Sequence, residues 1–322
     1  TSEIAGFLTF FIGMLSYYGE ITMALILTII ITVILYARSV LHHFAQKIST
    51  EEMADTLKFA VIAFVILPLL PNKGYGPYEI FNPYVVWLMV VFISGIGFVG
   101  YVAMKWFGEK GVALAGILGG LVSSTAVTTS FAGRSKKESK IYQALILGVI
   151  LANGVMLTRI LVVTTVINSD LVWKLLLPML ILIAITGIFA YWLWEKAKNI
   201  KGKVELESPF TLVPAFKFGA FFAFVLAIVK LADVYFSSQG VYAVSFISGF
   251  ADVDAITISL SQLAKTTLSP EIARNGIILA ALTNVGVKGG IAYFFGGKEF
   301  GRIVATFYAV LIVIGIGLIL LL

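Results

Sequence analysis

The sequence contains no cysteine and only two histidines among its 322 residues. The absence of cysteine excludes disulfide bonds and thiolate metal sites within this chain and leaves the redox compartment open. The histidines, His42 and His43, are neighbours, so on a helix they point in different directions and make a poor metal-binding pair. No HExxH, GxSxG or Walker phosphate-binding motif occurs, so we expect no enzyme activity and no nucleotide-driven pumping.

Charged residues are also scarce. They make up 12% of the chain, whereas a soluble domain carries about 25%. Hydrophobic residues make up 60%, and the mean hydropathy is +1.01. This excess of apolar side chains, arranged in repeated runs of about 20 residues, predicts an all-α, polytopic helical membrane protein. A membrane β-barrel is excluded because its strands would alternate apolar and polar residues, and these runs do not.

The apolar segments predict about ten to twelve transmembrane or re-entrant helices. The basic loops around Arg134 and Lys196 are two segments apart, so they lie on one side of the membrane, which we take as the cytoplasmic side. The net charge of +6 is therefore a topology signal of a multi-pass inner-membrane protein in contact with the lipid bilayer, and not a nucleic-acid-binding surface. Three segments separate the loop 38–58 from Arg134, so either this loop is external or one segment between 54 and 133 is re-entrant. The loop has no net charge, so its charge alone does not define its side of the membrane. The expected segments are 3–17, 20–37, 54–70, 83–107, 111–133, 141–166, 171–194, 210–236, 241–264, 271–295 and 302–322.

Two aspartates, Asp252 and Asp254, interrupt an apolar run in the stretch SGFADVDAITISL (248–260). A carboxylate at the centre of a bilayer helix costs about 2.5–3.5 kcal/mol on insertion scales, and such residues usually serve a function. Two residues apart on a regular helix, they would point about 200° away from each other. They can serve one site only if the helix is interrupted, so we expect a break between Gly249 and Asp254.

A polar stretch in the first half of the chain matches this one. GLVSSTAVTTS (120–130) aligns with GFADVDAITIS (249–259), and the two aspartates stand where Ser123 and Thr125 stand. Transporters often contain such repeats, with a binding site between them formed by discontinuous helices. We therefore expect the two stretches to pack close together in the protein interior.

The helices that follow the two stretches align as well. Residues 144–160 match residues 275–291, and this alignment pairs Asn153 with Asn284. The repeat predicts a pseudo-symmetric core, and a long polar linker at 196–209 divides the chain roughly in two. Small and hydroxyl side chains also serve simple helix packing in membranes, and this interpretation stays open for the serines, threonines and asparagines.

Four stretches carry a resemblance to a known family: LKFAVIAFVILPLLP (57–71), GYGPYEIFNP (74–83), GGLVSSTAVT (119–128) and GFADVDAITISLSQLA (249–264). From about residue 50 onward, the chain resembles the membrane domain of unknown function that follows the MgtC/SapB module in long bacterial and archaeal homologues. The region 1–48 resembles the distal part of that module. Such proteins are usually named magnesium transporters or magnesium-homeostasis proteins, so the resemblance implies a role in magnesium homeostasis but supplies no substrate for the C-terminal domain.

The resemblance and the repeat together predict the domain organisation. The start of the MgtC module is absent from the sequence, so we expect the protein partner to be a second copy of the chain or a separate N-terminal MgtC segment. The expected parts are 1–48 as the distal MgtC-like region, 49–168 as the first repeat half and 169–322 as the second repeat half.

The leading functional hypothesis is a transporter or channel for a small cation, with a site between the two polar stretches and no bound cofactor. Asp252 and Asp254 are the candidate charged ligands and the candidate metal ligands. Mg²⁺ suits such a site because it prefers oxygen ligands and needs only one or two carboxylates. Protons are the other candidate, because a buried aspartate can bind and release one. Neutral ligands and pathway residues are expected to be Ser123, Ser124, Thr125, Thr128, Thr257, Asn153 and Asn284.

Two basic residues within the matched helices, Arg159 and Lys288, are candidate charge partners for the aspartates. Two other functions stay open. The protein could be a membrane-embedded regulator or partner subunit in magnesium homeostasis that transports nothing. It could also be a carrier of a lipid or another amphipathic molecule, which the 13% aromatic content favours.

Overall fold

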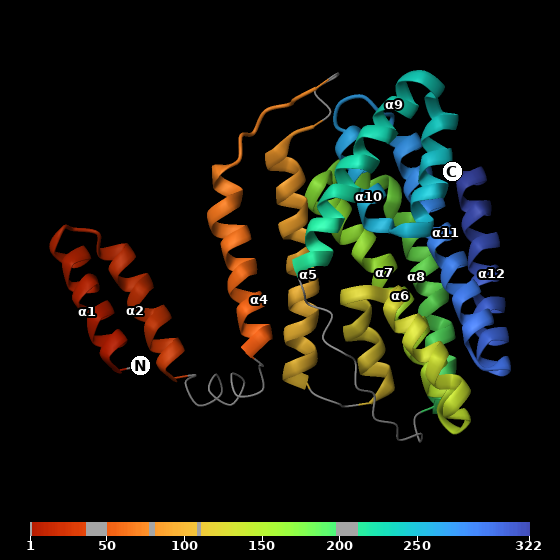
Figure 1. Ribbon diagram of the computed structural model, residues 1–322, viewed down its shortest axis with the longest axis horizontal. Coiled ribbons are helices and arrows are strands. Elements are labelled where there is room, and N and C mark those ends of the chain that lie inside the picture. Colours follow the sequence, from red (N-terminus) through yellow and green to blue (C-terminus); the bar gives the residue numbers. More distant parts are fainter. Residues whose placement is uncertain (1, 37–49, 77–80, 108–110, 198–211) are drawn as a thin grey trace. The chain divides into compact units, whose positions relative to one another are not determined.

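A computed structural model describes residues 2–36, 50–76, 81–107, 111–197 and 212–322 (Figure 1). These residues form eleven α-helices and no β-strand apart from a single bridge between Tyr75 and Phe81. Seven of the helices are long and apolar enough to cross a membrane. The chain is therefore an all-α, multi-pass membrane protein, as the sequence predicts.

The chain divides into two compact units, residues 1–53 and 54–322. In the first unit, α1 (Ser2–Tyr17) and α2 (Ile21–Tyr36) are joined by a tight turn. Gly19 occupies this turn with φ of 84°, a backbone conformation that glycine adopts without a steric penalty. The two helices match the expected segments 3–17 and 20–37.

The second unit begins within α4 (Thr50–Val61) and continues through irregular turns to α5 (Pro83–Phe107). A π-helical turn at Ile62–Ile66 leads into a 3₁₀ turn at Leu67–Leu69. The Trp87 indole Nε1 of α5 donates a hydrogen bond of 3.0 Å to the Ile62 carbonyl, which fixes α5 against this turn.

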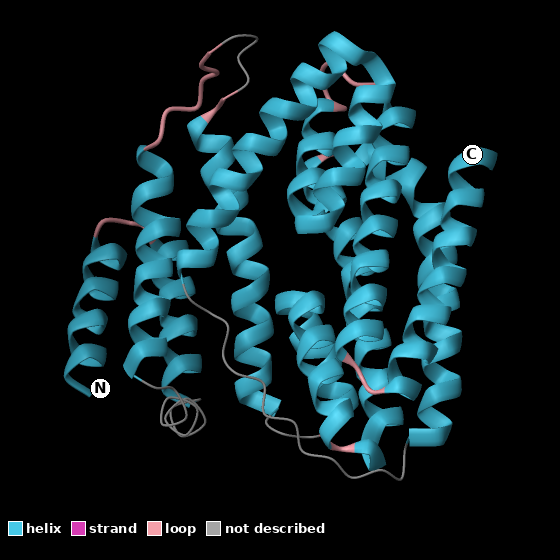
Figure 2. Ribbon diagram, turned by 45° about the vertical axis from the view of Figure 1, so that its right-hand side comes forward, coloured by secondary structure: helices cyan, strands magenta, loops and turns pink. Residues whose placement is uncertain are grey.

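The remaining helices pack beside one another (Figure 2) and carry the polar residues of the two matched stretches. Two of them, α7 and α11, are the most buried of the seven candidate spans, with 61% and 56% of their most apolar stretch inside the protein. These are the helices that contain the matched residues 144–160 and 275–291, so the repeat places its second helix at the centre of the bundle in both halves. The core helices are α6 (Val112–Lys137), α7 (Tyr142–Ile167), α8 (Ser169–Ala197), α9 (Leu212–Ala251), α10 (Val253–Leu263), α11 (Pro270–Phe295) and α12 (Lys298–Leu321).

The helix α9 contains a sharp turn at Ser237, where φ is 51° and ψ is −144°. This turn falls between the expected segments 210–236 and 241–264, so the sequence predicts the division correctly. Gly240 packs so closely on the preceding turn that a Cβ atom there would lie 2.6 Å from the Ala232 carbonyl oxygen. A glycine is required at this position for the chain to turn so tightly.

Candidate functional site

Ser123 and Asp252, which the repeat aligns, interrupt their helices in the same way. Ser123 lies in the middle of α6 with φ of −160° and ψ of 107°, and Asp252 separates α9 from α10 with φ of −157° and ψ of 138°. Both are extended backbone conformations within helical surroundings. The expected break between Gly249 and Asp254 is confirmed, and its counterpart in the first half falls at the equivalent residue.

Each of these residues also caps the helix that follows it. The Ser123 Oγ accepts a hydrogen bond of 3.2 Å from the Ala126 amide. The Asp252 Oδ1 accepts bonds from the amides of Asp254, at 2.6 Å, and Ala255, at 3.1 Å. Serine and aspartate are preferred N-cap residues because their side chains satisfy amides that lack a partner in the first turn. The breaks therefore arise from local sequence, and each starts a half-helix whose positive dipole end lies at the break.

The backbone carbonyls just before the breaks receive hydrogen bonds from the two central helices. The Leu121 carbonyl accepts a bond of 2.9 Å from Arg159 Nη1 of α7, and the Gly249 carbonyl accepts a bond of 3.1 Å from Asn284 Nδ2 of α11. Broken helices persist inside a membrane protein only where such partners replace the lost helix bonds. In both halves, a polar side chain of the second repeat helix serves this purpose.

Glycines at equivalent positions bring each broken helix close to its central helix. A Cβ atom at Gly120 would lie 2.7 Å from Ala152 Cα, and one at Gly249 would lie 2.5 Å from the Ala280 carbonyl oxygen and 2.7 Å from Thr283 Cβ. Ala152 and Thr283 are themselves equivalent when 144–160 is aligned with 275–291. The repeat therefore extends from the sequence to the contacts between helices.

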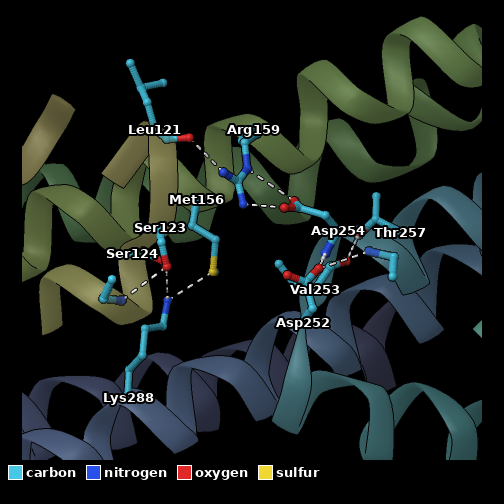
Figure 3. Close-up of polar contacts among 12 residues, drawn as sticks. Leu121, Ser123, Ser124, Met156, Arg159, Asp252, Val253, Asp254, Thr257 and Lys288 are labelled. Carbon is cyan, nitrogen blue, oxygen red and sulfur yellow. Dashed lines mark hydrogen bonds and ion pairs between the residues drawn. The ribbon is translucent and has the colours of Figure 1, made fainter. Parts of the chain in front are cut away.

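A buried ion pair connects the two breaks (Figure 3). The Arg159 guanidinium, already bonded to Leu121, donates from Nε to Asp254 Oδ1 at 3.2 Å and from Nη2 to Asp254 Oδ2. The two side chains are 11% and 4% exposed. Because Leu121 belongs to the first break and Asp254 to the second, the two polar stretches lie together, as the repeat predicts.

Lys288 of α11 forms a second polar cluster with side chains of α6 and α7. Its side chain is fully buried, and its Nζ lies 2.7 Å from Asn153 Oδ1, 3.3 Å from Ser124 Oγ and 3.0 Å from Met156 Sδ (Figure 3). A lysine ammonium can only donate, so the Asn153 oxygen faces it. The Asn153 Nδ2 consequently has no hydrogen-bond partner among the residues that the structure describes.

The hydrogen bonds described for these two clusters do not involve the three candidate threonines. The hydroxyls of Thr128 and Thr257 each donate to the carbonyl four residues earlier in their own helix. Thr125 is partly buried beside the first break, as is Asp252 at the second. Sequence reasoning missed Met156 and the Leu121 carbonyl as parts of the site. No sequence signal marks them, because their roles follow from packing.

The carboxylates of Asp252 and Asp254 already have hydrogen-bond partners within the protein. Both oxygens of Asp254 are bonded to Arg159, and Oδ1 of Asp252 is bonded to backbone amides. Within the described part of the chain, no group of three or more histidine, cysteine, aspartate and glutamate side chains is arranged to hold a metal ion. A metal ion bound by both aspartates would therefore require the Arg159 pair to open first.

These features define a membrane protein whose core is built from two equivalent broken helices joined by a buried ion pair. Residues 91–296 match a family described as a domain of unknown function, DUF4010, and the chain belongs to that family. It is 34% identical over 200 residues to an "Uncharacterized protein" of Aquifex aeolicus (strain VF5), and the match covers 61% of this chain and 87% of the relative. No solved structure matches the chain significantly. The matched region contains both breaks, and the resemblance of the region 1–48 to the MgtC module stays a prediction.

Proposed function

We propose that this protein is an inner-membrane transporter of a small cation and that opening of the Arg159–Asp254 pair is part of its transport step. The observation that carries the proposal is the connection of two repeat-equivalent helix breaks through this one pair. In transporters with internal repeats, the site lies at such breaks, and one repeat moves relative to the other. A charge pair that bridges the repeats must change when they move.

The contacts favour a proton over Mg²⁺ as the transported cation. A proton needs only one carboxylate oxygen, and its binding neutralises Asp254 and releases the Arg159 guanidinium. Mg²⁺ needs near-octahedral oxygen coordination, whereas the hydroxyls of Thr128 and Thr257 are directed to their own helices. Magnesium transport, which the two carboxylates and the neutral oxygen ligands predict from the sequence, is tested in the same experiment.

Flux into proteoliposomes tests the proposal. The purified chain is reconstituted with an internal pH indicator or, in a parallel sample, with an internal Mg²⁺ indicator, and a gradient of the cation is imposed. We expect proton flux above that of empty liposomes and its loss in Asp254→Asn. The matched control is Glu271→Gln, which removes an exposed pair with Lys174 of 2.7 Å and should leave flux unchanged.

Other outcomes of the same measurement separate the remaining functions. Flux of Mg²⁺ that Asp252→Asn and Asp254→Asn abolish would replace the proton with the metal ion. Flux equal to that of empty liposomes for both cations would contradict transport. In that case the protein would be the membrane regulator, which should co-purify in mild detergent with a second copy or with an MgtC module. Under each of these functions we expect no catalytic turnover.

A further inference from the structure

A cavity of about 410 Å³ lies between α5, α6, α7 and α8. Arg159 of α7 is one of the residues that line it. Its volume falls within the range of about 300–1,000 Å³ typical of ligand pockets. Most of its lining is aliphatic, with Ile96, Leu121 and Ile183 as examples from three of the four helices. All four helices are candidate membrane spans, so the cavity lies within the apolar part of the protein.

The polar groups of the lining are few. The hydroxyls of Thr158 and Thr186 donate to carbonyls of their own helices, Gly154 and Leu182, at 2.9 and 2.7 Å. Among the lining residues that the structure describes, Arg159 is the one charged residue. An apolar cavity of this kind does not hold water stably, so a hydrocarbon chain is the occupant that suits its surface.

Two features show how such a chain could enter and fit. Val162 of α7 lines the cavity and is 48% exposed. Gly187 lines the cavity from α8, and a Cβ atom added there would meet nothing within 4 Å. The cavity is thus open toward the surface of a membrane-spanning helix, and part of its volume exists because residue 187 lacks a side chain.

We infer that this cavity binds a single-chain anionic amphiphile, with its chain between the four helices and its acidic head group on Arg159. The inference rests on the proposed function, because the head group takes the place of Asp254 on the guanidinium. When the Arg159–Asp254 pair opens, the anionic head group replaces the Asp254 carboxylate as the partner of Arg159. Arginine binds a carboxylate or phosphate with two parallel hydrogen bonds, so either head-group chemistry satisfies it.

Charge complementarity separates this ligand from its competitors. A neutral lipid chain would fill the cavity but leave the Arg159–Asp254 pair intact. A small inorganic anion would find only one charged group in an apolar wall and would lose its hydration without compensation. An anionic amphiphile gains from both parts of the site. The substrate class of the transporter is then a long-chain acid carried together with one proton.

Direct binding to the full chain in nanodiscs of zwitterionic lipid tests the inference. The probes are a dansyl-labelled fatty acid, its alkyl phosphate counterpart and the neutral amide of the same chain. We expect both acids to bind about tenfold more tightly than the amide, the size of one charge-assisted contact. The two acidic head groups distinguish carboxylate from phosphate ligands.

Variants assign the binding to this cavity. Gly187→Leu adds a side chain whose Cβ atom meets nothing within 4 Å and takes up part of the cavity, so it should weaken acid binding about tenfold or more. The control is Gly317→Leu in α12, where a Cβ atom also meets nothing within 4 Å and which is not part of the lining. The double variant Arg159→Gln/Asp254→Asn keeps a neutral hydrogen-bonded pair and should abolish the preference for acid over amide, with size-exclusion chromatography confirming an intact fold.

The outcomes separate failure of the site from failure of transport. Unchanged acid binding in Gly187→Leu would overturn the cavity as the site. Equal binding of acid and amide to the unmodified protein would overturn the role of Arg159. Acid binding with the expected preference, but without proton flux above that of protein-free liposomes when both are given the same acid, would contradict the proposed function and leave the binding site standing.

Discussion

Asn153 and Asn284 occupy equivalent positions in the two halves of the chain but make opposite hydrogen bonds. Asn153 accepts from Lys288 through its oxygen, whereas Asn284 donates to the Gly249 carbonyl through its nitrogen. The two asparagines thus stand at aligned positions of the repeat, but their side chains serve different purposes. Such a difference allows one half to hold a charge while the other half stabilises the broken helix.

The first prediction separates capping from ion binding at Asp252. Asp252→Asn keeps an oxygen that can accept from the amides of residues 254 and 255, whereas Asp252→Ala removes it. We expect Ala to lower the free energy of unfolding by about 1 kcal/mol and Asn to change it by less. Thermal unfolding in detergent measures the difference. Equal destabilisation by both substitutions would contradict the capping role.

The second prediction concerns the close contacts of the repeat glycines. Gly120→Ala and Gly249→Ala place a Cβ atom 2.7 Å and 2.5 Å from backbone atoms of the neighbouring helix. Overpacking of this kind costs about 1–3 kcal/mol, so both variants should unfold at lower temperature.

A matched glycine provides the control for these contacts. Gly290→Ala, in α11, meets nothing within 4 Å and should be neutral or stabilising, because alanine favours a helix by about 1 kcal/mol over glycine. If Gly290→Ala lost as much stability as the other two variants, the close approach of the helices would not explain their behaviour.

The third prediction tests the ion pair by a double-mutant cycle. Asp254→Asn and Arg159→Gln each leave a buried charge without its partner, which costs about 3–5 kcal/mol. The double variant removes both charges, so its loss of stability should be clearly smaller than the sum of the two single losses. Additive losses in the unfolding measurement would show that the two side chains do not interact.

The fourth prediction distinguishes a structural from a functional role of Lys288. Its hydrogen bonds in the described structure are all to neutral groups, those of Asn153, Ser124 and Met156. Lys288→Met removes a costly buried charge but leaves two polar neighbours without a donor, and the two effects are of similar size, so stability should change by about 1 kcal/mol or less. If Lys288 takes part in transport, proton flux should fall at least about tenfold in this folded variant. Full flux in Lys288→Met would exclude a transport role.

The sequence predicts the helices and the position of the second break well, because both depend on local information. Apolar length defines the spans, and two aspartates two residues apart require an interruption if they share a site. The capping role of Asp252 also has a local signal, since an aspartate just before a helical stretch is a typical N-cap; the sequence interpretation assigned it instead to an ion. The alignment of 120–130 with 249–259 identified Ser123 as its counterpart.

The arrangement around Arg159 lay beyond sequence reasoning. Arg159 is 38 residues from Leu121 and 95 from Asp254, and only the packing of α7 against both broken helices brings the three together. The sequence marked Arg159 and Lys288 as equivalent candidates for an ion pair with either aspartate. The choice between them depends on helix rotation, which hydrophobic periodicity does not define in helices that are apolar on all sides.

The balance of charge at the Arg159–Asp254 pair has a consequence for the electrical behaviour of the membrane. A proton that crosses alone carries one positive charge, and a membrane potential of about 100 mV contributes about 2.3 kcal/mol to its movement. A proton that crosses together with a monoanionic amphiphile carries no net charge. Clamping the voltage across proteoliposomes with potassium and valinomycin should therefore accelerate the first process and leave the rate of the second unchanged.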